Sequence, residues 1–219
     1  MPGKTYEDIT TVVPLHQRRE ISGIAVISTP VEEIRNLAAH AISYKARYSL
    51  SSLTGISETI LAAKEKAGRA ARGQQHILLQ GEPGIGKQRL AHGIHQASPR
   101  AAGPLIALHC GDLTPDELSA ELFGTADGLR PGKLDLANGG TLFIDEVEKL
   151  GLDLAEVLLE RFREKKDSGK PPDIRLIAAC DSDLKRLTDK GLFHPDLYKI
   201  LAKTVIRIPP LSARREDIP

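Results

Sequence analysis

The chain has 219 residues, of which 41% are hydrophobic, so it can bury one substantial core. Its 30 basic and 29 acidic residues give a formal net charge of +1, which excludes a global field that would attract nucleic acid or an anionic membrane. Cys110 and Cys180 end apolar runs, a pattern that favours buried reduced thiols and a cytoplasmic location. No apolar run approaches the ~20 residues that cross a bilayer, so no membrane partner is expected.

Residues 1–49 are interpreted as a linker. The apolar run 22–28 is typical of a short strand, and Pro30 opens a stretch whose apolar residues keep helical spacing as far as Ile42. A segment of this length buries too little apolar surface to offset its conformational entropy as an ordinary independent domain. The sequence therefore predicts a strand followed by a connecting helix.

From Leu50 onward, helical patterns alternate with short apolar runs. This alternation is typical of an α/β fold in which a parallel sheet is wrapped by helices. The five predicted strands are 76–80, 105–109, 141–144, 174–179 and 205–208.

A glycine-rich segment between a predicted strand and a predicted helix has the spacing of a P-loop. Such a loop turns successive backbone N–H groups toward a phosphate, and Lys87 at the start of the helix would reach the outer phosphates of ATP or ADP. The alternative is a plain strand-to-helix turn, which the flanking elements disfavour. Gln88 stands where many P-loops place a hydroxyl on Mg²⁺. The candidate nucleotide-binding residues are Gly81, Glu82, Pro83, Gly84, Ile85, Gly86, Lys87 and Gln88.

Two adjacent carboxylates end the predicted strand 141–144. Beside a P-loop, Asp145 would hold Mg²⁺, directly or through water, and Glu146 would polarise the water that attacks the γ-phosphate. The alternative is a helix N-cap followed by a first-turn acid. The preceding P-loop favours the catalytic interpretation of Asp145 and Glu146.

Residues 50–219 resemble the central AAA+ ATPase domain of sigma-54-type enhancer-binding transcription activators. The resemblance is carried by the motifs at 81–87, 121–124, 139–146 and 209–219. It implies a P-loop NTPase (AAA+) three-layer α/β/α sandwich that takes ATP or ADP with Mg²⁺ and forms a homo-oligomer. It also implies a parent protein that acts on RNA polymerase or a regulatory protein, and that binds DNA through a C-terminal domain missing here. The family's helical lid is likewise expected to be absent.

Several positions depart from this family. After Gly124 the chain has no Gly-Ala-Phe-Thr-Gly-Ala loop, which in the family engages sigma-54. The family's two arginine fingers are replaced by His194 and Ile200, and its coupling asparagine by His109. The sensor Thr-Asn pair is Cys180-Asp181.

This pattern of departures is similar to that of the dihydroxyacetone kinase operon regulators. In that comparison, residues 23–48 are similar to the end of a PAS-type sensor and its linking helix. We expect nucleotide binding with weak hydrolysis and no engagement of sigma-54. The alternatives are an active ring-forming ATPase and a docking module with a vestigial P-loop.

Two further groups of residues are given structural roles. His92 and His95 could share one helix face and bind a metal ion, but without a third ligand we expect packing or surface roles. The basic cluster on the Ala-rich stretch before the P-loop is expected to be a solvated helix face rather than a nucleic-acid site. Its members are Lys64, Lys66, Arg69 and Arg72.

Overall fold

The computed structural model describes residues 8–17, 20–30, 46–125, 130–163 and 172–218. The chain divides into two compact units, 1–45 and 46–219, which are described separately. Among the helices described, none has the length and apolar character that a membrane span requires.

The first unit contains an antiparallel hairpin of two strands. They are β1 (Asp8–Gln17) and β2 (Glu20–Pro30), paired with a register irregularity near Leu15 and His16. The predicted strand 22–28 lies inside β2, whereas β1 was not predicted. Pro14 in β1 lacks a backbone N–H, which argues against a central strand but is tolerated in a two-stranded sheet, where both strands are edges. The helix predicted after Pro30 falls on residues outside the described part.

The second unit is built on a five-stranded parallel sheet in the order β4-β5-β6-β3-β7. Every predicted strand is confirmed, with each end placed within one residue. Since all the strands are parallel, their carboxyl ends meet at one edge of the sheet. The strands are β3 (Ile77–Gln80), β4 (Leu105–His109), β5 (Thr141–Asp145), β6 (Arg175–Cys180) and β7 (Val205–Arg207).

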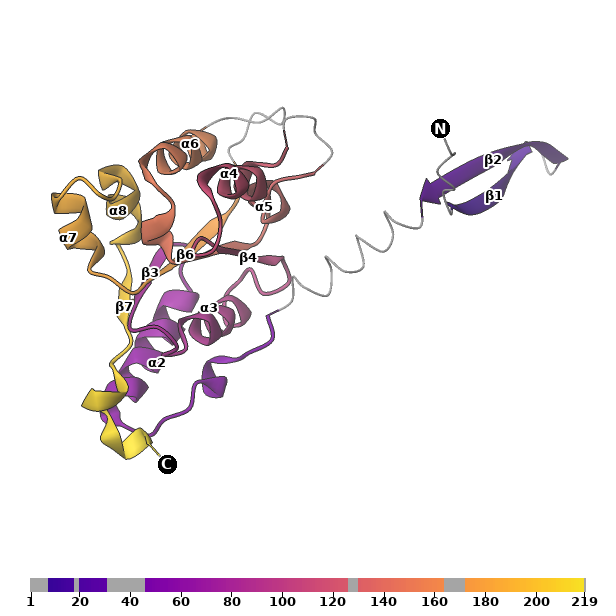
Figure 1. The fold of residues 1–219 in the computed structure, drawn as a ribbon. Helices are drawn as coiled ribbons and strands as arrows, with labels where there is room; N and C mark the ends of the chain where they lie inside the picture. Colours follow the sequence, from indigo (N-terminus) through magenta and orange to yellow (C-terminus); the bar gives the residue numbers. More distant parts are fainter. Residues whose placement is uncertain (1–7, 18–19, 31–45, 126–129, 164–171, 219) are drawn as a thin grey trace. The chain divides into compact units, whose positions relative to one another are not determined.

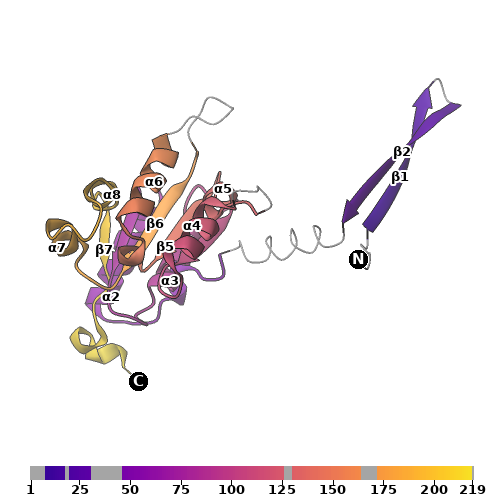
Figure 2. The same cartoon turned by 45° about the horizontal axis from the view of Figure 1, so that its top comes forward.

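Helices cover both faces of this sheet, which confirms the three-layer α/β/α sandwich (Figures 1 and 2). One face carries α2 (Glu58–Ala71) and α3 (Lys87–Gln96). The other carries α4 (Pro115–Phe123), α5 (Lys133–Leu136), α6 (Leu152–Arg163), α7 (Leu184–Asp189) and α8 (Pro195–Leu201).

The core beneath α2 and α3 explains why these helices pack on the sheet. Ile60, Ala67, Leu90 and Ile94 present buried apolar side chains from the two helices to the buried strand β3. Burying each large aliphatic side chain contributes about 1.5–3 kcal/mol, so this layer fixes α3 directly behind the P-loop strand.

The two histidines of α3 have packing roles, as predicted. His95 Nδ1 lies 2.8 Å from Thr141 Oγ1 inside the core. His92 Nδ1 accepts a hydrogen bond of 3.0 Å from the backbone N–H of Arg47, and its ring packs edge-on against Tyr48. Burial is the main cause that lowers the pKa of both histidines. The described residues contain no cluster of His, Cys, Asp and Glu suited to a metal ion.

The basic cluster of α2 is a solvated helix face, as predicted. Lys66, Arg69 and Arg72 are exposed, and Arg69 forms an ion pair with Glu65 one turn earlier. Lys64 Nζ donates a 3.3 Å hydrogen bond to the carbonyl of Gly55.

Candidate functional site

The loop between β3 and α3 has the backbone that a phosphate cradle requires. Gly84 and Gly86 adopt φ angles of +73° and +103°, a region that glycine occupies without steric cost. Gly86 is the N-cap of α3, so the helix begins at Lys87 and directs its free N–H groups toward the loop. The loop therefore joins a glycine turn to a helix N-terminus, the arrangement that favours an anion.

The side chain of Lys87 lies inside this loop. It is 7% exposed, and its Nζ donates to the carbonyl oxygens of Gly81 at 2.8 Å and Glu82 at 2.9 Å. It also forms an ion pair with Asp181, which follows β6. The exposed side chain of the neighbouring Gln88 offers no hydroxyl to a metal ion.

Asp145 and Glu146 lie at the carboxyl end of β5, on the same sheet edge as the P-loop. Glu146 has φ 53° and ψ 48°, a left-handed conformation that costs a non-glycine residue of order 1–3 kcal/mol. It precedes the 3₁₀ turn η2 (Val147–Lys149), but its side chain makes no capping hydrogen bond and instead forms an ion pair with Lys149. Gly111 lies opposite this carboxylate, and a Cβ at Gly111 would require the Glu146 side chain to move.

The carboxylate of Asp145 could contribute one ligand to Mg²⁺. Its Oδ1 accepts the backbone N–H of Glu146 at 3.1 Å, and its Oδ2 lies 3.4 Å from His109 Nδ1. Mg²⁺ is commonly held by one or two carboxylates together with phosphate oxygens and water. The donor set therefore fits a metal ion that arrives with the phosphates of a nucleotide, with Asp145 as its protein ligand.

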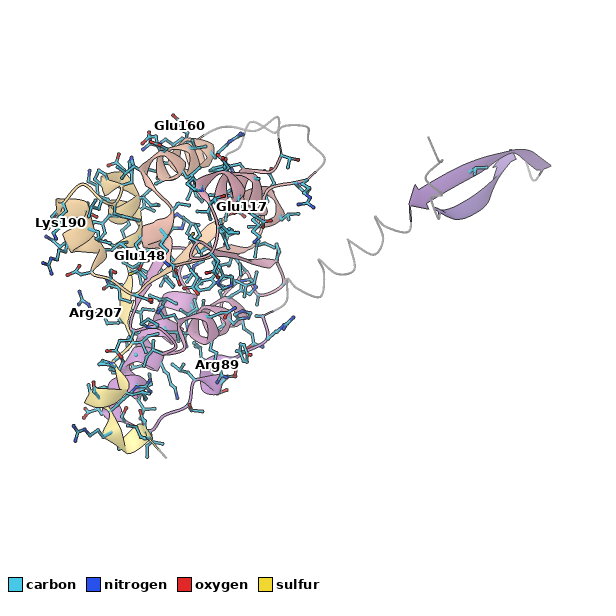
Figure 3. The ribbon with its side chains drawn as sticks, viewed as in Figure 1. Arg89, Glu117, Glu148, Glu160, Lys190 and Arg207 are labelled. Atoms are coloured by element: carbon cyan, nitrogen blue, oxygen red, sulfur yellow. The ribbon has the colours of Figure 1, made fainter. Side chains whose placement is uncertain are left out.

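Further carboxylates make the strand-end edge electronegative. Glu148 Oε1 accepts the backbone N–H of Asp181 at 3.0 Å and joins the ends of β5 and β6; Figure 3 labels Glu148. Burial raises the pKa of the Cys110 thiol to about 12, and the nearby charges of Asp145 and Glu146 act in the same direction. Cys110 and Cys180 are both free and buried, as predicted.

A cavity of about 340 Å³ opens beside the P-loop, within the size range of small-ligand sites. Its walls come from three segments that are distant in the sequence: the residues before α2, the P-loop with the start of α3, and the C-terminal turns. Arg89 of α3, a cationic residue labelled in Figure 3, is one of the lining residues. The lining residues are Leu53, Thr54, Gly84, Ile85, Gly86, Arg89, Leu211, Arg214 and Asp217.

Asp217 joins two of the segments around the cavity. Its Oδ1 accepts the N–H groups of Ile56 at 2.6 Å and Ser57 at 2.9 Å, and its Oδ2 accepts the Ser57 hydroxyl at 2.7 Å. The buried Arg214 donates to Asp217 Oδ2 at 3.4 Å and to the carbonyl of Pro209 at 3.2 Å. These contacts fix the C-terminal turns beside the P-loop.

His194 stands at one arginine-finger position and Lys199 precedes Ile200 at the other, and both side chains contact groups of their own chain. His194 Nε2 lies 2.6 Å from Glu156 Oε2, and its Nδ1 accepts the N–H of Asp196 as the N-cap of α8. Lys199 Nζ pairs with Asp196 at 2.9 Å. Neither side chain is free of intramolecular contacts.

Backbone contacts join the two described ends of the segment after α4. Gly124 and Pro131 form an antiparallel bridge, and Thr125 N–H donates to the carbonyl of Arg130 at 3.1 Å. A Cβ at Gly132 would collide with the backbone of Phe123 and Leu122, so the two ends of the segment are in close approach. The sequence has four residues between Thr125 and Arg130.

The structure brings the predicted residues to one sheet edge and adds others. The P-loop, Asp145 and Glu146 lie at the carboxyl ends of β3 and β5. Sequence reasoning missed the pairing of Lys87 with Asp181 and six of the residues that line the cavity: Leu53, Thr54, Arg89, Leu211, Arg214 and Asp217. Arg214 belongs to the family motif at 209–219, but that motif does not indicate that Arg214 lies beside the P-loop.

Residues 53–207 match the model of the Sigma-54 interaction domain family, which is more than half of the chain. The C4-dicarboxylate transport transcriptional regulatory protein DctD of Pseudomonas aeruginosa is 41% identical over 180 residues, 76% of this chain and 39% of that protein. The transcriptional activator RocR of Bacillus subtilis is 34% identical over 229 residues, 97% of this chain and 50% of that protein. The chain thus spans half or less of the length of these relatives.

Two solved structures extend the comparison. NtrX from Brucella abortus in complex with ATP has a TM-score of 0.70 at 28% identity, over 86% of this chain and 44% of that one. The P-loop NTPase domain of a sigma-54 transport activator from E. coli has a TM-score of 0.53 at 27% identity, over 72% of this chain and 99% of that one. The sequence motifs, the order of the strands and the relatives all indicate the same family. The chain belongs to the Sigma-54 interaction domain family, an AAA+ P-loop domain of transcriptional regulators.

Proposed function

We propose that this chain is the ATP- and ADP-binding AAA+ core of a bacterial transcriptional regulator, with weak hydrolysis and no engagement of sigma-54. The observation that carries the proposal is the P-loop with buried Lys87 beside a cavity of about 340 Å³. In this arrangement the phosphates lie against the loop, and the base and ribose occupy the cavity between Leu53 and Arg214. The NtrX structures with ATP and ADP support a nucleotide as the ligand.

The replaced arginine fingers support weak hydrolysis. An arginine finger supplied by a neighbouring subunit can be worth roughly 10³–10⁵ in rate. Here His194 caps α8 and pairs with Glu156, while Lys199 pairs with Asp196. Neither side chain presents the planar guanidinium fork that binds a phosphate in two places. If the chain forms a homo-oligomer, these residues therefore supply little charge to a neighbouring nucleotide.

The joined ends of the segment after α4, with only four residues between Thr125 and Arg130, support a regulator that acts without sigma-54. These ends are joined by the bridge between Gly124 and Pro131, and the family's sigma-54 contact sequence is absent between them. We therefore infer that the parent protein acts on a partner other than sigma-54, either RNA polymerase or a regulatory protein. Because this chain spans half or less of relatives that are transcriptional regulators, we propose that the parent binds DNA through another part of its sequence.

Calorimetric titration with ATP and ADP tests the binding proposal. Both nucleotides should bind wild-type protein, and Lys87→Ala should reduce the affinity for both. Thermal unfolding should show that the variant remains folded. Unchanged binding by a folded Lys87→Ala protein would contradict the role of the P-loop, and absence of binding by folded wild-type protein would support a docking module with a vestigial loop.

A working ATPase is the second candidate, favoured by the geometry of Glu146. A non-glycine residue in the left-handed region stores strain of a kind that clusters at functional sites. Phosphate release by wild-type protein should be measured across protein concentrations against Glu146→Gln. Turnover that rises with concentration and is lost in the variant supports an active ring, whereas a rate equal to that of the variant supports the first proposal.

A further inference from the structure

The ammonium group of Lys87 has no hydrogen-bond donor left over in the described part of the chain. An ammonium group has three N–H donors. One contacts the carbonyl oxygen of Gly81 at 2.8 Å, one that of Glu82 at 2.9 Å, and one the carboxylate of Asp181. A phosphate oxygen can reach Lys87 only by displacing one of these acceptors.

Of the three acceptors, Asp181 is the one that competes as a charge. The carbonyl groups of Gly81 and Glu82 are neutral, whereas a carboxylate offers Lys87 the same kind of ionic partner that a phosphate does. Lys87 is 7% exposed and the Asp181 side chain is 28% exposed. Their interaction is therefore screened less by solvent than that of an exposed surface pair.

The sheet fixes the position of Asp181. Cys180 is the register partner of Gln80 on the neighbouring strand, and its carbonyl accepts the N–H of Gly81 at 3.3 Å. The next residue, Asp181, donates its own N–H to Glu148 Oε1 at 3.0 Å. With the backbone anchored on both sides, the carboxylate stays beside Lys87 unless its side chain rotates away.

This placement affects the phosphates of a nucleotide unequally. The P-loop backbone cradles the α- and β-phosphates and the lysine reaches the β- and γ-phosphates, so a triphosphate places one more charged group beside Lys87 and toward the strand ends. At that edge lie the carboxylates of Asp145, Glu146 and Asp181. The γ-phosphate of a triphosphate adds negative charge beside them, which they repel. A diphosphate keeps the backbone contacts and avoids most of this repulsion.

We propose that Asp181 is a specificity-determining residue that makes the site retain nucleoside diphosphates in preference to triphosphates by competing for Lys87. The proposal rests on the nucleotide-binding function proposed above and adds which phosphate state the site favours. A triphosphate binds fully only when Lys87 leaves Asp181. The position of Asp181 thereby sets the ligand that the domain holds at rest.

The test is calorimetric titration of the 219-residue chain with ADP and with a β,γ-nonhydrolysable ATP analogue. Wild-type protein should bind ADP about tenfold more tightly than the analogue, a ratio equivalent to ~1.4 kcal/mol. Asp181→Asn keeps the size of the side chain but removes its charge, and should strengthen analogue binding about tenfold while changing ADP binding much less. Asp189→Asn makes the same charge change at the exposed end of α7 and should leave the ratio unchanged.

Each outcome decides one of the two proposals. Equal affinity ratios in wild-type and Asp181→Asn protein overturn the role of Asp181 and leave the nucleotide site intact. Absence of binding by either nucleotide to any of the folded proteins overturns the proposed function itself. Should Asp181→Asn fail to fold, Asp181→Ala and Asp181→Ser apply the same test.

Discussion

Nδ1 of His109 lies 3.4 Å from Oδ2 of Asp145, and the two residues are register partners on the adjacent strands β4 and β5. The other oxygen of Asp145 accepts the backbone N–H of Glu146. Both oxygens of the proposed Mg²⁺ ligand therefore already contact protein groups. The imidazole of His109 competes with a metal ion for the Asp145 carboxylate. The side-chain amide of an asparagine at position 109 would compete less strongly.

We therefore predict that His109→Asn strengthens the coupling between Mg²⁺ and nucleotide. ADP affinity should be titrated with Mg²⁺ and with a chelator, and the gain from Mg²⁺ should be about three- to tenfold larger in the variant than in wild type. Asp145→Asn should abolish the gain in either background. If Mg²⁺ increased ADP affinity equally in wild type and in His109→Asn, His109 would not compete with Mg²⁺ for Asp145.

The two P-loop glycines should respond differently to alanine. Gly86 has φ +103°, and a Cβ there would lie 2.9 Å from Leu53 Cδ1, so Gly86→Ala combines backbone strain with a clash against a cavity wall. Gly84 has φ +73° with no atom within 4 Å of its Cβ position, so Gly84→Ala adds backbone strain alone. We predict that Gly86→Ala lowers ADP affinity and thermal stability more than Gly84→Ala, which should cost about 1–2 kcal/mol in unfolding free energy.

The matched control for this pair is Gly139→Ala. Gly139 also has a positive φ, +76°, with no atom within 4 Å of its Cβ position, and it lies before β5, far along the chain from the P-loop. It should lose stability like Gly84→Ala while binding ADP like wild type. Equal ADP affinities in all three variants would show that the P-loop backbone does not hold the ligand.

The strands of the sheet, the glycine-rich P-loop and the Asp145-Glu146 pair could be predicted from the sequence because each has a local sequence signal. An apolar run such as 105–109 predicts a buried strand, and a glycine turn between a strand and a helix predicts an anion cradle. The missed strand β1 carries Pro14, which is typical of loops and edges rather than of a regular strand.

The rest of the site depends on contacts between distant segments. Leu53 and Arg214 line the same cavity although they lie far apart in the sequence. Their segments are joined by the hydrogen bond between Ser57 and Asp217, which are 160 positions apart. No periodicity indicates such a contact. The ion pair of Lys87 with Asp181 likewise arises because β3 and β6 are neighbours in the sheet, which the sequence order conceals.

Asp217 predicts a defined change of stability in acid. Burial alone would raise the pKa of Asp217, but hydrogen bonds from Ser57, Ile56 and Arg214 outweigh it and lower the pKa from 3.8 to about 2. A carboxyl group with a depressed folded pKa stabilises the protein above its unfolded pKa, and this contribution is lost as the pH falls through the folded value. The difference in unfolding free energy between wild type and Asp217→Asn should therefore be largest at neutral pH and narrow between about pH 4 and pH 2. Urea unfolding at several pH values measures it, and a constant difference would rule out the ionised carboxylate as the source.

His76 gives the second pH prediction, in a higher range. Burial, followed by the positive charges of Arg175, Lys203 and Arg100, lowers the pKa of His76 from 6.5 to about 4. The neutral ring accepts the N–H of Leu176 at 2.9 Å, so protonation would also remove an acceptor from the start of β6. Between these two pKa values the unfolded chain binds a proton on His76 that the folded chain does not.

Stability should consequently rise with pH from about 4 to 6.5 and level off on either side, since the unfolded state binds more protons within that window. The full contribution is about 3–4 kcal/mol, because one pKa unit is worth about 1.4 kcal/mol and the shift is from 6.5 to about 4. His76→Gln keeps an oxygen acceptor for Leu176 but does not titrate, so its curve of unfolding free energy against pH should be flatter in this range. His92 and His95, whose pKa values are also lowered, should leave some slope in the variant. If the curves of unfolding free energy against pH were parallel for wild type and His76→Gln, His76 would have the same pKa in the folded and unfolded chain. Protonation of the buried ring would then not destabilise the protein.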